Sequence, residues 1–89
     1  MAEDRDTRLK RLRLRSWRRG TKEMDLILGS FADEQMPLLS DAELDAHEVI
    51  MAEHDHDLYQ WISGQVEVPE EIRPALNRVT EHFLKQKTE

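Results

Sequence analysis

The sequence contains no cysteine, which excludes disulfide bonds, thiolate metal sites, iron–sulfur clusters and cysteine nucleophiles. Only three glycines and three prolines occur in 89 residues, which disfavours a β-rich fold with many tight turns. No apolar run approaches the ~20 residues that cross a bilayer, and the first residues lack the apolar region of a secretory signal. We therefore expect one small domain without membrane insertion, suited to a reducing compartment.

The chain also lacks the sequence patterns of common enzymes. It has no Gly-rich phosphate loop, no dinucleotide fingerprint and no G-x-S-x-G nucleophile elbow. Residues 54–57 read His-Asp-His-Asp, but histidines two apart point away from each other on a helix, so helix initiation is favoured over metal binding. We interpret His47 and His82 as packed or solvated side chains. The expected protein is not an enzyme and holds no metal.

The basic residues are concentrated near the N-terminus. Residues 1–22 hold nine of the 13 lysines and arginines and three acids, whereas residues 23–89 hold four basic residues and 16 acids, for an overall net charge of −6. Such a segment suits an acidic protein surface or nucleic acid phosphates. The residues that would contact nucleic acid are Arg8, Arg11, Arg13 and Arg15. The net acidic charge and the missing nucleic-acid-binding signatures favour the protein surface.

Apolar residues spaced three and four apart predict a compact all-α bundle of about five short helices. We expect a single domain over residues 1–89, with residues 1–6 as a disordered arm and residues 86–89 as a frayed tail. The expected helices cover residues 7–18, 21 to just before Pro37, 41–53, 55 to just before Gly64, and 69 onward. Because Pro74 cannot donate a helical hydrogen bond, we expect a distortion there or a later start of the last helix.

Capping residues support these boundaries. Gly20 fits the C′ position after the first helix, and Thr21 can cap the second. Ser40 and Glu43 form the pattern of a capping box, and Asp55 is a suitable N-cap for the fourth helix.

The turn between the first two helices gathers the most unusual set of side chains. Trp17, three basic residues and Glu23 lie within seven positions. One interpretation is purely local. The positive charge of Arg19 stabilises the C-terminal end of the first helix, Gly20 adopts a positive φ, and Glu23 lies in the first turn of the second helix. The other is an interface, because an aromatic ring beside guanidinium groups is typical of binding hot spots.

The residues around this turn resemble a known family. Residues 16–33, SWRRGTKEMDLILGSFAD, are similar to the signature of the succinate dehydrogenase assembly factor 2 family, whose bacterial members are SdhE-type flavinylation factors. The family's R-G-x-x-E motif is matched by Arg19, Gly20 and Glu23. Two further segments also fit, namely LLSDAEL at 38–44 and DHDLYQWISG at 55–64.

The resemblance implies a five-helix assembly factor that binds the flavoprotein subunit of succinate dehydrogenase, and in some bacteria that of fumarate reductase. Such a protein promotes covalent attachment of FAD to a histidine of its client. It binds no cofactor stably itself, since FAD belongs to the client. A bacterial cytoplasm is the expected location. An antitoxin-type interaction protein and the nucleic-acid binder are the alternatives.

The implied partner-binding residues are Arg19, Gly20 and Glu23, with Trp17, Arg18 and Asp25 as weaker candidates. We expect Arg19 to donate hydrogen bonds to the client, so that Arg19→Ala costs little thermal stability. Gly20 would allow two backbones to approach closely. Glu23 would pair with a cation of the client or orient Arg19.

Overall fold

The computed structural model describes residues 3–87, and within them the chain forms five α-helices, two single-turn 3-10 helices and no strand. The elements are α1 (Arg5–Ser16), α2 (Lys22–Glu34), η1 (Met36–Leu38), α3 (Asp41–Met51), α4 (Asp55–Ile62), η2 (Glu70–Ile72) and α5 (Arg73–Lys87). The predicted all-α fold of about five helices is confirmed.

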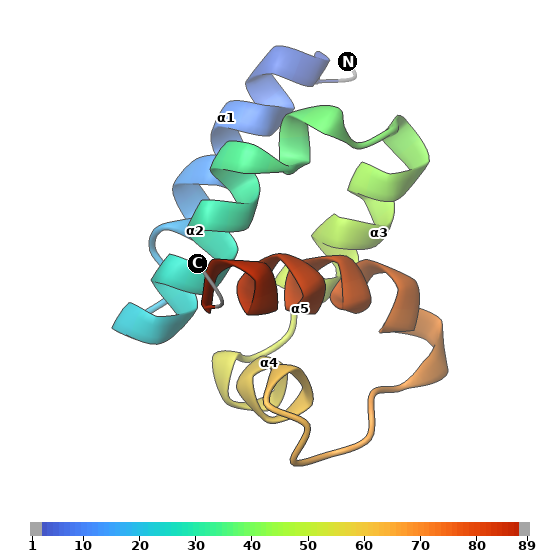
Figure 1. Ribbon diagram of the computed structural model, residues 1–89. Coiled ribbons are helices and arrows are strands. Elements are labelled where there is room, and N and C mark those ends of the chain that lie inside the picture. The colour runs from blue at the N-terminus through green and yellow to red at the C-terminus, as the bar shows by residue number, and fades with distance from the viewer. Residues whose placement is uncertain (1–2, 88–89) are drawn as a thin grey trace.

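Helices α2, α3 and α4 pack against α5. α1 and α2 form an antiparallel hairpin, α5 crosses both α2 and α3, and α4 packs against the opposite side of α5 (Figure 1). The turn between α1 and α2 therefore comes close to the junction between α3 and α4. This proximity of two chain reversals, distant in sequence, positions the candidate site.

Two groups of buried side chains hold the bundle together. The i, i+3, i+4, i+7 stripe predicted on α2 is buried and packs on α4 and α5, as helical periodicity requires. Its members are Met24, Ile27, Leu28 and Phe31. A smaller group lies between α1 and α3, with Leu12 and Leu44 fully buried at its centre.

The first helix differs from the predicted one at both ends. It begins at Arg5 because the Asp4 carboxylate accepts a hydrogen bond from the Thr7 amide at 2.7 Å, so the arm predicted for residues 1–6 is wrong over residues 3–6. Residues 1 and 2 lie outside the described part. At the other end Trp17 is the C-cap, so Gly20 is not the C′ residue. The tail predicted at 86–89 is helical at 86 and 87, and residues 88–89 are not described.

Most of the other predicted caps are confirmed. Thr21 caps α2 through the Met24 amide. The backbone amide of Ser40 donates to the Glu43 carboxylate at 2.9 Å, completing the capping box and lowering the pKa of Glu43 below its ordinary value. Gly64 follows α4 with a φ of 82°, which favours glycine.

Two further helix boundaries differ from the predicted ones, and a third agrees. α3 ends at Met51, two residues before its predicted end. The N-cap of α4 is His54 and not the predicted Asp55, whose carboxylate instead accepts a hydrogen bond from the distant Arg19. α5 begins at Arg73, which leaves Pro74 in the first turn, where its missing amide costs nothing. The later start expected from Pro74 is confirmed.

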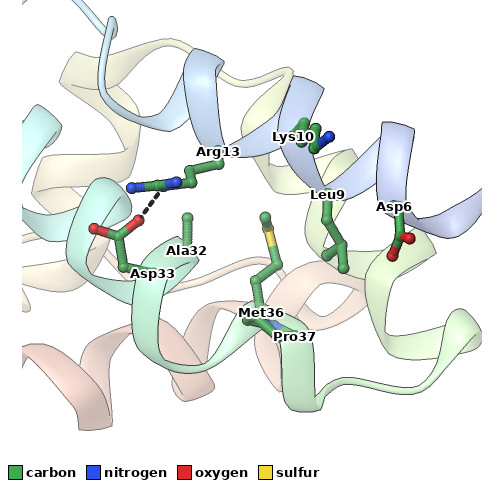
Figure 2. A pocket seen from close by; sticks show the side chains of 8 residues that line it. All are labelled: Asp6, Leu9, Lys10, Arg13, Ala32, Asp33, Met36 and Pro37. Carbon is green, nitrogen blue, oxygen red and sulfur yellow. Dashed lines mark hydrogen bonds and ion pairs between the residues drawn. The ribbon is translucent and has the colours of Figure 1, made fainter.

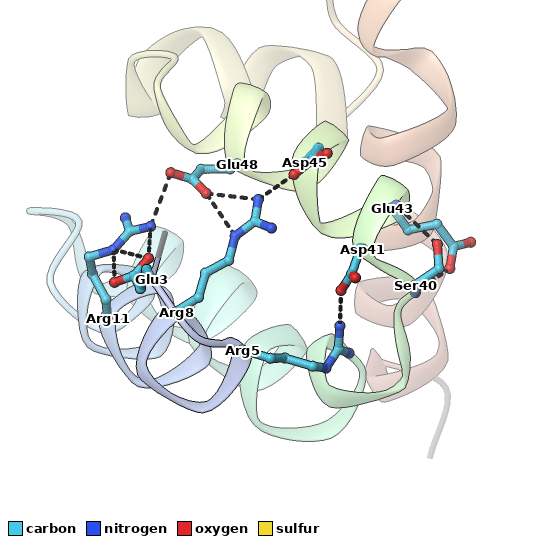
Figure 3. Close-up of polar contacts among 9 residues, drawn as sticks. All are labelled: Glu3, Arg5, Arg8, Arg11, Ser40, Asp41, Glu43, Asp45 and Glu48. Carbon is cyan, nitrogen blue, oxygen red and sulfur yellow. Dashed lines mark hydrogen bonds and ion pairs between the residues drawn. The ribbon is translucent and has the colours of Figure 1, made fainter. Parts of the chain in front are cut away.

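Ion pairs fasten α1 to α3. Three arginines at intervals of three on α1 face acids of α3 (Figure 3). The pairs are Arg5–Asp41 at 2.8 Å, Arg8–Asp45 at 2.7 Å, Arg8–Glu48 at 3.0 Å and Arg11–Glu48 at 3.3 Å. An isolated exposed pair contributes only ~0–1 kcal/mol, but here they share partners and form a network. The basic face of α1 is thus largely neutralised by the protein's own body.

Trp17 lies flat against the backbone of α2 at Gly29. A Cβ added at Gly29 would lie 2.7 Å from Cε3 of the indole, and closer still to Cδ2 and Cε2. The indole nitrogen donates to the Asp33 carboxylate at 3.4 Å. Gly29 is therefore required by the close approach of the ring.

We expect Gly29→Ala to lower the free energy of unfolding by about 1–2 kcal/mol, because the overlap with the indole outweighs the better helix propensity of alanine. Urea denaturation monitored by tryptophan fluorescence measures the change. In a Trp17→Ala background the same substitution should no longer destabilise. An equal loss in both backgrounds would contradict the packing argument.

His47 is a buried neutral base. It is 1% exposed and stacks on Phe31, with ring centroids 4.9 Å apart, and neither ring nitrogen has a hydrogen-bond partner among the described residues. Burial, together with the Arg78 cation, lowers the pKa of His47 to about 4.

This shift predicts loss of stability in acid. Below pH ~6.5 His47 is protonated in the unfolded chain but stays neutral in the folded protein. The free energy of unfolding therefore falls as the pH is lowered from ~6.5 to 4, by up to about 3 kcal/mol. Denaturation at a series of pH values should show a shallower decline for His47→Leu, which also keeps near wild-type stability at pH 7. The exposed His56→Gln should follow the wild-type curve. A wild-type slope in His47→Leu would refute this assignment.

Candidate functional site

Arg19 joins the α1–α2 turn to the α3–α4 junction. Its side chain is only 12% exposed. Nε donates to the Asp55 carboxylate at 2.7 Å, Nη1 to the Met51 carbonyl at 2.6 Å and Nη2 to the Glu53 carbonyl at 2.7 Å. The Met51 carbonyl lies at the C-terminal end of α3, where carbonyl groups lack helical partners, and the Glu53 carbonyl lies two residues further along, in the junction to α4. The guanidinium therefore caps one helix and neutralises a carboxylate at the start of the next.

These contacts differ from what the sequence led us to expect. The donors expected to reach a client are occupied by acceptors of the same chain. Truncation of Arg19 would leave Asp55, itself 17% exposed, without its cation, so the expectation that Arg19→Ala costs little stability is inconsistent with the structure. Whether Arg19 also touches a client stays a prediction.

Asp25 fixes the same turn from the other side. Its carboxylate accepts from the backbone amide of Arg19 at 2.6 Å. Asp25 and Asp55 together hold Arg19, so the suggestion that Glu23 orients Arg19 is wrong. No local spacing connects Arg19 to Asp55, which lies 36 residues later, and sequence reasoning missed this pair.

Gly20 is exposed at the tip of the turn with a φ of 117°, a conformation that favours glycine. A Cβ there would meet only Asp55 Oδ2, at the ordinary contact distance of 3.8 Å. Within the chain, therefore, Gly20 is needed for its backbone conformation and not for lack of space.

Glu23 presents a free carboxylate. It lies in the first turn of α2, is exposed, and makes no hydrogen bond or ion pair with another described residue. It stands at the edge of a hollow of about 380 Å³ between α2, α4 and α5, whose apolar wall includes Leu26, Tyr59 and Phe83. Sequence reasoning missed this hollow, because its lining residues come from three helices.

The six predicted site residues fall into two groups. Arg18, Gly20 and Glu23 are exposed around the turn. Trp17, Arg19 and Asp25 make internal contacts that hold the turn in place. The structure thus brings all six to one corner, with half of them facing outward.

A larger hollow, of about 560 Å³, lies beside α1 and is lined by none of these six residues (Figure 2). Leu9, Ala32 and Met36 provide its apolar surface, and the Arg13–Asp33 ion pair, at 2.6 Å, borders it.

Most of the arginines considered for nucleic acid binding already form ion pairs with acids of the same chain. Arg8, Arg11 and Arg13 form ion pairs within the chain, and only Arg15 of the four has no ion pair with the described residues. The described residues contain no cluster of three or more potential metal ligands. Nor does any helix in residues 3–87 have the length and apolar character needed to cross a membrane.

The chain is similar in sequence to mitochondrial succinate dehydrogenase assembly factors. The chain is 34% identical over 76 residues to the mitochondrial succinate dehydrogenase assembly factor 2 of Dictyostelium discoideum, covering 85% of this chain and 54% of that protein. The corresponding protein of Schizosaccharomyces pombe is 38% identical over 73 residues, covering 82% and 52%. The chain thus spans about half the length of these two mitochondrial relatives.

A bacterial relative is covered more fully. The FAD assembly factor SdhE of Acetobacter pasteurianus is 35% identical over 75 residues, covering 83% of this chain and 69% of that protein. No solved structure matches the chain significantly. The Sdh5 family, described as flavinator of succinate dehydrogenase, matches residues 10–86. Since this match spans nearly the whole chain and includes the Arg19–Gly20–Glu23 turn, the protein belongs to the Sdh5 family of succinate dehydrogenase flavinators.

Proposed function

We propose that this protein binds the flavoprotein subunit of succinate dehydrogenase through the turn that carries Arg19, Gly20 and Glu23, and promotes covalent attachment of FAD to that subunit. The observation that carries the proposal is the geometry of the turn. Arg19 is held by acceptors at 2.6–2.7 Å, while Gly20 and Glu23 project outward. A rigid support beneath exposed groups is what a specific docking surface requires.

The proposed contribution to chemistry is positioning. Attachment requires the flavin and a histidine of the client to be held in reactive geometry, and correct orientation alone can lower a barrier by several kcal/mol. Glu23 would pair with a cation of the client, and the exposed backbone at Gly20 would let a client segment approach closely. Arg19 would act indirectly, by keeping both in place.

Three finer points belong to the same proposal. The chain acts without an active site of its own, and FAD remains with the client. The fumarate reductase flavoprotein is a second candidate client. The bacterial cytoplasm is the proposed location, supported by the similarity to the Acetobacter pasteurianus protein, although other relatives are mitochondrial.

Glu23→Gln tests the free carboxylate. Because Glu23 has no internal partner among the described residues, we expect unchanged unfolding free energy, within about 0.5 kcal/mol. Covalent flavin on the client should fall by about tenfold, since a pairing charge is lost. Client and variant are co-expressed, and the flavin fluorescence of the client is measured on a denaturing gel. Glu71→Gln, at another exposed acid, is the matched control. If both variants support equal flavin attachment, Glu23 is not part of the site.

Two substitutions at Gly20 separate conformational strain from contact with the client. Gly20→Ala and Gly20→Arg should each cost about 1–2 kcal/mol of stability, because both place a Cβ at a φ of 117°. Gly20→Ala should also weaken binding, because its Cβ enters the close approach to the client, and Gly20→Arg should abolish binding by projecting a long side chain into the docking surface. Melting temperatures and client pull-downs measure the two effects. Wild-type binding by both variants would place Gly20 outside the interface.

A further inference from the structure

Arg15, in the last turn of α1, and Arg18, just after that helix, lack the internal ion pairs that neutralise four other arginines of the segment. Arg5, Arg8, Arg11 and Arg13 all bind acids of the chain. Arg15 and Arg18 are exposed, and neither side chain makes an ion pair or hydrogen bond with any residue from 3 to 87. A chain of net charge −6 therefore keeps a local positive surface here.

These two arginines line a hollow. It measures about 370 Å³ and is completed by Leu14, Arg19 and Met51. Leu14 is 54% exposed although it is apolar, and it forms the accessible wall. Because Asp55 already neutralises Arg19, the uncompensated positive charge at the hollow comes from Arg15 and Arg18.

The position of the hollow connects it to the proposed docking turn. Arg18 and Arg19 immediately precede Gly20 in the chain, and both line the hollow. A client segment that covers Gly20 can therefore continue over the hollow without leaving the surface. The volume lies near the lower end of the ~300–1,000 Å³ typical of ligand pockets, which suits a single side chain used as an anchor.

We infer that this hollow docks an acidic segment of the client flavoprotein, with one apolar side chain seated against Leu14 and Met51 and carboxylates beside Arg15 and Arg18. The inference rests on the proposed function. Charge complementarity selects the occupant, since a protein surface of mostly acidic character attracts a carboxylate only where cations remain unpaired. A nucleic acid is disfavoured because most of the arginines that would line its path are occupied.

The test measures the affinity of the purified protein for the purified flavoprotein subunit of succinate dehydrogenase by calorimetry, at low and moderate salt. Wild-type affinity should fall as salt rises. Arg15→Glu should weaken binding about tenfold, by replacing attraction with repulsion. Leu14→Ser should weaken it about fivefold and leave the salt dependence unchanged, because an apolar contact is lost. Lys10→Glu, an equal charge reversal at an exposed lysine of α1 outside the hollow, should change affinity less than about twofold.

Several outcomes would overturn the inference. Equal weakening by Arg15→Glu and Lys10→Glu would mean a general charge effect without a docking site. Unchanged client affinity in Arg15→Glu and Leu14→Ser, with wild-type binding intact, would remove the hollow from the interface and leave the proposed function standing. Binding of duplex DNA or RNA that Arg15→Glu abolishes, with client affinity unaffected, would make phosphate the occupant. If the wild-type protein fails to bind the flavoprotein, the proposed function itself fails. Circular dichroism should show that all three variants stay folded, since the substituted side chains are exposed.

Discussion

The partly buried guanidinium of Arg19 makes the interactions on which the candidate site depends. A cation removed from water is tolerated only if its donors find acceptors, and here one carboxylate and two carbonyls supply them. The acceptors come from the end of α3 and the start of α4, so the arginine fixes two chain reversals against each other. The residues of the motif therefore have different roles: Arg19 holds the turn in place through internal contacts, while Gly20 and Glu23 are exposed to solvent.

Most of the positive charge of the N-terminal segment is neutralised by ion pairs with acidic residues of the same chain. The basic N-terminal segment does not extend toward solvent as an arm, because its arginines face the acids of α3 (Figure 3). Each pair contributes little by itself, yet together they orient α1 and bring its last turn beside α3. The positive surface that remains is small and adjoins the docking turn. The internal ion pairs therefore determine which arginine side chains remain available to bind a partner.

Much of the fold could be predicted because its signals are local. Thr21, Gly64 and the Ser40–Glu43 box act within one helical turn, and the apolar stripe of α2 follows directly from helical periodicity. The predictions failed where a distant residue intervened. Asp55 looked like an N-cap, but its carboxylate is taken by Arg19, and His54 caps α4 without a side-chain hydrogen bond.

The sequence by itself determined the number of helices, most of their caps and the family to which the turn belongs. Only the tertiary structure decided which motif residues face outward, which arginines are neutralised and where the hollows lie. The reason is physical: caps and stripes join residues within about four positions, whereas Arg19 meets Asp55 across 36 residues and Trp17 rests on Gly29 of the next helix. Such contacts form only when the helices pack together, so the spacing of residues along the chain does not predict them.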